Sequence, residues 1–211
     1  SPQLAMANAV RETLRMGDVL EKMCCCLRQI LDGANGQNFR QVRDNHNVIK
    51  DFDRAIKAYL TKLGRESLDE QDEYRCTEIL NFTTAIDHIS NIVVMNMVEL
   101  VETAQKNQVA ISDEDVEDEF RLLDMVLVNL RMSFSVLMTG DAATAARLIE
   151  RKQTFRVAER KAVNEHLQRL RNDQMLDQEA SAIHLSLLSD MRRINSLLSA
   201  GAYLVAGQTE K

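Results

Sequence analysis

The stretch AIDHISNIVVMN, residues 85–96, places three polar side chains that can bind a metal ion or form hydrogen bonds inside an otherwise apolar run: Asp87, His88 and Asn91. Residues four apart lie on one face of a helix, so Asp87 and Asn91 can converge on a cation or on a neighbouring helix. The sequence leaves two interpretations open, a metal site and a hydrogen-bonded polar seam between helices. The seam is preferred, because buried polar groups in proteins are usually hydrogen-bonded to one another.

A second polar feature is the basic stretch at residues 147–171, in which lysine and arginine outnumber acids. One interpretation is a solvated helix face with internal ion pairs such as Arg156 with Glu159. The other is a surface that binds phosphate, anionic lipid headgroups or acidic loops of a partner protein. The candidate residues for this anion or partner surface are Arg147, Arg151, Lys152, Arg156 and Arg160.

The remaining chemistry-bearing residues predict no catalytic site. The four histidines, His46, His88, His166 and His184, are scattered along the chain, and neither a glycine-rich phosphate loop nor a nucleophile elbow occurs. The acids at residues 113–119 crowd a predicted helix start, where they complement the helix dipole and are expected on a solvated face. Cys24 falls on an apolar stripe and Cys25 among charged residues, so both are expected to be free thiols. The chain is therefore predicted not to be an enzyme.

Composition indicates an all-α protein. Of 211 residues, 45% are hydrophobic and 27% charged, and the chain contains one proline and seven glycines. Few proline and glycine residues mean few breaks in helices. The net charge of −6 argues against a nucleic-acid partner, which requires a basic surface. No uninterrupted apolar run is long enough for a bilayer, and no signal peptide is evident.

Apolar spacing and turn residues predict six helices. Ser112 and Asp141 are expected to cap two of them. The first five predicted ranges are about 5–32, 39–63, 70–106, 113–139 and 142–171, and a sixth helix follows the connector at residues 172–179 and ends near residue 206.

The two halves of the chain resemble one another. A shift of 107 residues superposes Gly33 on Gly140 and keeps the apolar positions in register. We therefore predict two tandem three-helix bundles that form a pseudo-repeat, with domains at residues 3–108 and 109–206.

Five segments carry a resemblance to a known family. They are LRMGDVLEKM, AIKAYLTKL, EILNFTTAIDHISNI, ERKAVNEHLQRLR and HLSLLSDMRRINSLLSAGAYL, in this order, across residues 13–205. Together they resemble the cytoplasmic PhoU-like domain of the bacterial sodium/phosphate cotransporter family.

This resemblance implies a function and a set of partners. The chain would be a cytosolic regulatory or coupling domain of a sodium-dependent phosphate transporter, on the cytoplasmic side of the inner membrane. Its partners would be the transmembrane portion of the same protein, a second copy of the chain in a homodimer, and inorganic phosphate or anionic lipid. The alternative is a stand-alone metal-binding regulator of phosphate signalling.

The resemblance also implies where a metal ion would bind. Stand-alone members carry two acidic residues four apart in each repeat, and Asp87 and Asn91 match these positions in the first half. In the second half the matching residues are Arg192 and Ser196, and a cation there opposes metal binding. His46 and Asn47 complete the weak candidate set in the first half. The sequence thus predicts no cofactor beyond one weakly bound divalent or iron ion.

Overall fold

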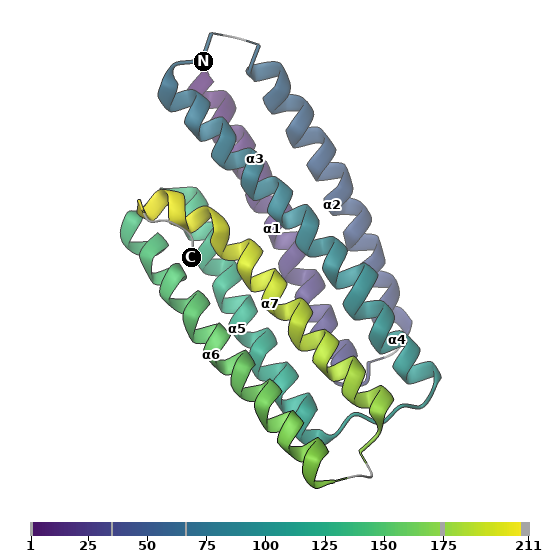
Figure 1. Cartoon of the computed structure of the whole chain (residues 1–211). Helices are drawn as coiled ribbons and strands as arrows, with labels where there is room; N and C mark the ends of the chain where they lie inside the picture. Colours follow the sequence, from purple (N-terminus) through teal and green to yellow (C-terminus); the bar gives the residue numbers. More distant parts are fainter. Residues whose placement is uncertain (1, 35, 66, 174–175, 208–211) are drawn as a thin grey trace.

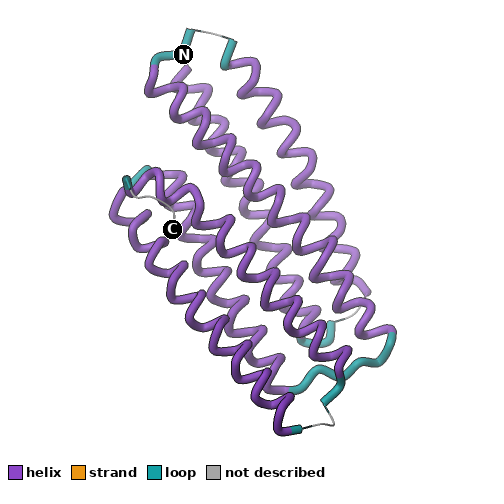
Figure 2. Tube along the Cα trace, viewed as in Figure 1, coloured by secondary structure: helices purple, strands orange, loops and turns teal. Residues whose placement is uncertain are grey.

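The computed structural model describes residues 2–34, 36–65, 67–173 and 176–207. Within these residues the chain is helical apart from short connectors, and it contains no β-strand (Figure 2). The elements are α1 (Pro2–Leu31), α2 (Gly36–Leu63), α3 (Glu70–Asn91), η1 (Ile92–Val98), α4 (Glu99–Lys106), α5 (Asp113–Thr139), α6 (Ala142–Asn172) and α7 (Gln178–Ala206).

The helix boundaries follow local signals in the sequence. The elements α3, η1 and α4 join without a break, so the described chain has the six long helices that were predicted. The Ser112 hydroxyl accepts a hydrogen bond from the Asp115 amide at 3.2 Å, and the Asp141 carboxylate accepts one from the Thr144 amide at 2.9 Å. Both predicted N-caps are therefore confirmed, because each satisfies an amide that the helix leaves without a partner.

The helices form two three-helix bundles that lie side by side (Figure 1). The first contains α1, α2 and the continuous helix α3–η1–α4, and the second contains α5, α6 and α7. Gly33 and Gly140, which the repeat aligns, follow the first helix of their bundles and both adopt positive φ, at 88° and 62°. The predicted fold class, two tandem three-helix bundles, is confirmed.

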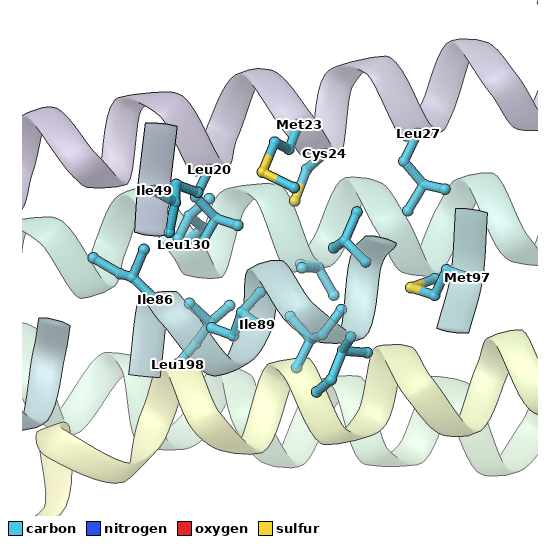
Figure 3. Packing of buried hydrophobic residues seen from close by; sticks show 14 of the residues in the cluster. Leu20, Met23, Cys24, Leu27, Ile49, Ile86, Ile89, Met97, Leu130 and Leu198 are labelled. Atoms are coloured by element: carbon cyan, nitrogen blue, oxygen red, sulfur yellow. The ribbon is translucent and has the colours of Figure 1, made fainter. Parts of the chain in front are cut away.

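One hydrophobic core runs through both bundles (Figure 3). Leu20 and Leu27 of the first bundle belong to the same buried cluster as Leu130 and Leu198 of the second. The halves therefore bury their apolar stripes against each other as well as internally. The domain division at residues 108 and 109 stays a prediction.

The cysteines behave as expected from the helical pattern. Cys24 is buried and Cys25 exposed, and all four thiols are free. Burial raises the pKa of Cys24 to about 12, so this thiol is an inert core residue.

Helix α5 is the one described helix that is long and apolar enough, by composition, to cross a membrane. The prediction from sequence, that no such segment exists, considered only uninterrupted apolar runs. Half of the most apolar 18-residue stretch of α5 is buried inside the bundle, as expected of a core helix.

Candidate functional site

A groove of about 1070 Å³ lies at the junction of the two bundles. One wall comes from the end of α3 and from η1 in the first bundle, and the other from α6 and α7 in the second. Clefts between packed helices are common ligand sites. The lining residues are His88, Asn91, Ile92, Met95, Asn96, Arg156, Glu159, Arg160, Val163, Arg192, Arg193, Ser196 and Leu197.

Four arginines make the lining of this groove basic. Arg156 and Arg160 come from α6, Arg192 and Arg193 from α7, and Glu159 is the one acid among the lining residues. Among the described residues, Arg156, Arg160 and Arg192 form no ion pair with a carboxylate, so their guanidinium groups remain available to a ligand. The expected internal pair between Arg156 and Glu159 is not formed. We call this feature the arginine groove.

Helix register explains why these arginines share one space. On α7, Met191, Ile194 and Asn195 are buried, so Arg192 and Arg193 between them point outward. Likewise, Arg156 and Arg160 are four residues apart and lie on one face of α6. The groove is therefore built where one helix face from each of two neighbouring helices meets the other bundle.

The opposite wall contains a π-helical segment. Element η1 interrupts the third helix directly after Asn91, and its Ile92, Met95 and Asn96 line the groove. The Asn96 amide donates to the Asp190 carboxylate of α7 at 3.3 Å. Burial raises the pKa of Asp190, against the opposing effects of Asn96 and of Arg193, which lies 3.4 Å away. Such π segments occur frequently at functional sites.

The residues of the opening sequence stretch form hydrogen bonds between α2 and α3. The His46 ring Nε2 lies 2.8 Å from Asn91 Oδ1, and the Lys50 ammonium donates to Asp87 Oδ1 at 2.7 Å. Asn47 is exposed. Asp87 is thus neutralised by a lysine, as expected for a polar seam, and the weak metal site on these residues stays a prediction.

His88 departs from the sequence interpretation. It was expected to be hydrogen-bonded between helices, but it is exposed and lines the arginine groove. The reason is its register, because it lies one residue beyond Asp87 and therefore about 100° further around the helix.

The residues of the predicted basic surface have different environments in the structure. Lys152 is only 1% exposed, and its ammonium lies 4.8 Å from the centre of the Tyr203 ring. The Arg151 Nε donates to Asn129 at 2.8 Å, and Arg147 contacts Thr144 at the exposed start of α6. Lys152 is therefore wrongly placed in the surface set, because α6 turns that position toward the core.

The acidic helix start is also buried in part. Asp115, Asp118 and Glu119 are at most 5% exposed, contrary to the expected solvated face. Although His166 and His184 are far apart in the sequence, they meet in the structure, where their ring centres lie 4.9 Å apart. Both histidines occur at apolar positions of their helices, and that register was the available sequence signal.

The arginine groove contains the kind of donors that anion recognition requires. Guanidinium groups donate paired hydrogen bonds to oxyanions, and several such groups around one cavity suit a tetrahedral anion such as phosphate. The histidine and the amides of the wall add further polar contacts.

These features define an all-helical protein with a PhoU-like fold. The crystal structure of the phosphate transport system regulatory protein PhoU from Streptococcus pneumoniae superposes with a TM-score of 0.85 at 12% identity, covering 100% of both chains. PhoU from Pseudomonas aeruginosa gives a TM-score of 0.80 at 15% identity, covering 97% of each chain.

The sequence itself is similar to longer proteins. It is 34% identical over 213 aligned positions to the "Putative inorganic phosphate export protein YjbB" of Escherichia coli K12, and 33% identical to the protein of the same name from Salmonella typhimurium. The chain is covered completely, but it spans only 39% of the length of these relatives. No protein-family model matches the chain.

Proposed function

We propose that this chain is a regulatory domain of an inorganic phosphate transport protein, and that the arginine groove binds the phosphate anion. The observation that supports this proposal is the set of four arginines between the bundles, three of them without an ion-pair partner among the described residues. A bound oxyanion would bridge α6 and α7 to α3, and so alter how the two bundles sit against each other. A ligand shifts the equilibrium between two arrangements of the bundles only if it binds one of them more tightly, and regulation requires such a shift.

The proposed direction of phosphate transport is export, as in the names of the relatives. The family resemblance implied sodium-dependent uptake, but the relatives carry the name of an export protein. We therefore propose a domain on the cytoplasmic side of a membrane-embedded phosphate exporter, without a role for sodium.

Phosphate titration of the purified chain tests the groove. In NMR spectra that resolve the arginine Nε–H signals, phosphate is expected to shift Arg156, Arg160 and Arg192. The Arg156→Ala and Arg192→Ala variants should bind more weakly. Arg147→Ala is the matched control, because Arg147 is an exposed arginine of α6 outside the groove. No shift at millimolar phosphate, or equal losses in the control, would refute phosphate binding by the groove.

Salt dependence supplies a second readout. Because the groove attracts the anion by charge, the apparent affinity for phosphate is expected to fall as sodium chloride rises. In cells that carry the full-length protein, Arg192→Ala should change phosphate efflux while the amount of protein in the membrane stays constant.

A stand-alone metal-binding regulator is the second candidate function. The structural neighbour from S. pneumoniae is named as a phosphate transport system regulatory protein, and its shared fold supports this alternative. The coding sequence around this chain separates the two candidates. Several adjacent apolar segments of bilayer length would support the transporter domain. Without such segments, bound iron or zinc that is lost in Asp87→Ala would support the regulator.

A further inference from the structure

A buried cluster of metal-binding side chains lies inside the second bundle, apart from the arginine groove. Asp115 is in the first turn of α5, His166 near the end of α6 and His184 near the start of α7. These three segments meet at one end of the bundle, since α6 runs antiparallel to its neighbours. The three side chains are at most 3% exposed, and one potential ligand atom from each lies within 4.8 Å of the others.

The distances within this cluster resemble those around a tetrahedral metal ion. Asp115 Oδ1 lies 2.9 Å from His166 Nδ1 and 3.3 Å from His184 Nε2. Zinc bonds of about 2.0–2.1 Å, at tetrahedral angles, separate neighbouring ligand atoms by roughly 3.3 Å. Two imidazoles and one carboxylate, completed by water, form a ligand set that suits a divalent first-row metal ion.

A second carboxylate orients one of the histidines. Glu119 Oε1 lies 2.7 Å from His184 Nδ1, and an ionised Glu119 accepts a hydrogen bond from Nδ1–H. The lone pair of the neutral ring is then on Nε2, which faces Asp115. Metal-binding histidines almost always donate their other N–H to a carboxylate or carbonyl in this way.

Unsatisfied buried atoms form a second line of evidence, and one of them, His184 Nε2, faces Asp115. Although His184 Nε2 lies 3.3 Å from Asp115 Oδ1, it makes no hydrogen bond to any described residue, and His166 Nε2 and Glu119 Oε2 lack partners as well. All three atoms are buried. Leaving buried polar atoms unpaired costs about 1–3 kcal/mol each, so such groups in one cluster call for an explanation.

Arg169 contacts the cluster and is partly exposed to solvent. Its guanidinium is 2.6 Å from Asp115 Oδ1 and 3.9 Å from Asp118 Oδ2, and its side chain is 29% exposed. When a metal ion neutralises Asp115, Arg169 can retain Asp118 as its partner.

We propose that Asp115, His166 and His184 bind a single zinc-class divalent metal ion, with Glu119 as the positioning residue of His184. This site joins all three helices of the second bundle, and the ion would fasten their ends together. It is distinct from the weak site predicted on Asp87 and Asn91 in the first bundle.

Zinc titration of the chelator-treated chain tests this proposal. Calorimetry and elemental analysis are expected to give one zinc ion per chain, and zinc should raise the melting temperature. His166→Gln and His184→Gln should each weaken binding by about a hundredfold or more. His88→Gln is the matched control, because it removes an exposed histidine of the first bundle that belongs to neither candidate metal site. Cobalt in place of zinc should show the absorption bands of a tetrahedral ion.

Several results would refute the proposed metal site. Failure of the chelator-treated wild type to bind zinc at micromolar concentration would overturn the proposal, and the cluster would then be a network of hydrogen bonds among these side chains. Unchanged affinity in both glutamine variants would do the same. If these variants fail to fold, as judged by circular dichroism, Glu119→Gln retains all three ligands and should weaken zinc binding about 10–100-fold. An unchanged affinity in folded Glu119→Gln would overturn the positioning role. None of these readouts depends on phosphate, so failure here leaves the proposed function intact.

Discussion

Gly17 of α1 lies directly against the ring of Phe134 in α5, where the two bundles touch. A Cβ atom on Gly17 would lie 2.5 Å from two carbon atoms of this ring. Glycine weakens a helix interior, and its presence in the middle of α1 is explained by the space that Phe134 requires.

Gly17→Ala is therefore expected to destabilise the protein by about 1–3 kcal/mol, because the Phe134 ring must move out of a packed interface. Gly201→Ala is the matched control. Gly201 is also helical, but an added Cβ would meet Phe82 at an ordinary 3.5 Å. The control should gain roughly 0.5–1 kcal/mol from helix propensity. Urea unfolding measures both values, and a loss of equal size in the two variants would contradict this account.

Tyr203 is expected to stabilise the protein through its ring and not through its hydroxyl. The ring faces the buried Lys152 ammonium, whereas the hydroxyl has no hydrogen-bond partner among the described residues. Tyr203→Phe should thus be neutral or slightly stabilising. Tyr203→Leu should lose about 2 kcal/mol, the strength of a desolvated cation–π contact. Thermal melts of the two variants test this order. A larger loss of stability in Tyr203→Phe than in Tyr203→Leu would contradict it.

Asn129 connects all three helices of the second bundle. Its amide donates to Asn195 at 2.7 Å, and its oxygen accepts from Arg151 at 2.8 Å. Asn129→Ala leaves both partners without this contact and should cost about 2–3 kcal/mol. A double-mutant cycle with Asn195→Ala should give a coupling energy of about 0.5–3 kcal/mol. Asn164→Ala, at an exposed position of α6, is the control and should change stability by at most about 0.5 kcal/mol.

Glu102 gives a stability contribution that depends on pH. The hydrogen bond from Arg43, at 2.5 Å, lowers the pKa of Glu102 below its ordinary value of 4.5, despite the opposing effect of burial. A carboxylate whose pKa is lower in the folded protein than in the unfolded chain stabilises the folded protein at pH values above the unfolded pKa. This contribution is lost as the pH falls through the folded pKa.

Glu102→Gln should therefore cost about 0.5–1 kcal/mol at neutral pH, and this cost should shrink as the pH falls below 4.5. Glu99→Gln is the control at an exposed position of the same helix. Urea unfolding across this pH range tests the trend, and a cost that grows toward low pH would show that the ion pair is not its source.

Sequence patterns alone predicted most of the fold. The helix ends at Ser112, Asp141 and Gly140 depend on residues close in the chain, as caps and turns always do. The apolar stripes that pair the halves recur at helical spacing, so they too can be recognised locally.

The candidate sites required the tertiary structure. Arg156 and Arg192 lie on different helices, and only the packing of α6 on α7 beside η1 places both in one groove. The sequence determined which residue types are present and which helix each occupies. The tertiary structure decided that Lys152 is buried, that His88 is exposed and that His166 meets His184. Contacts between helices depend on their rotation and offset, and no local pattern specifies these.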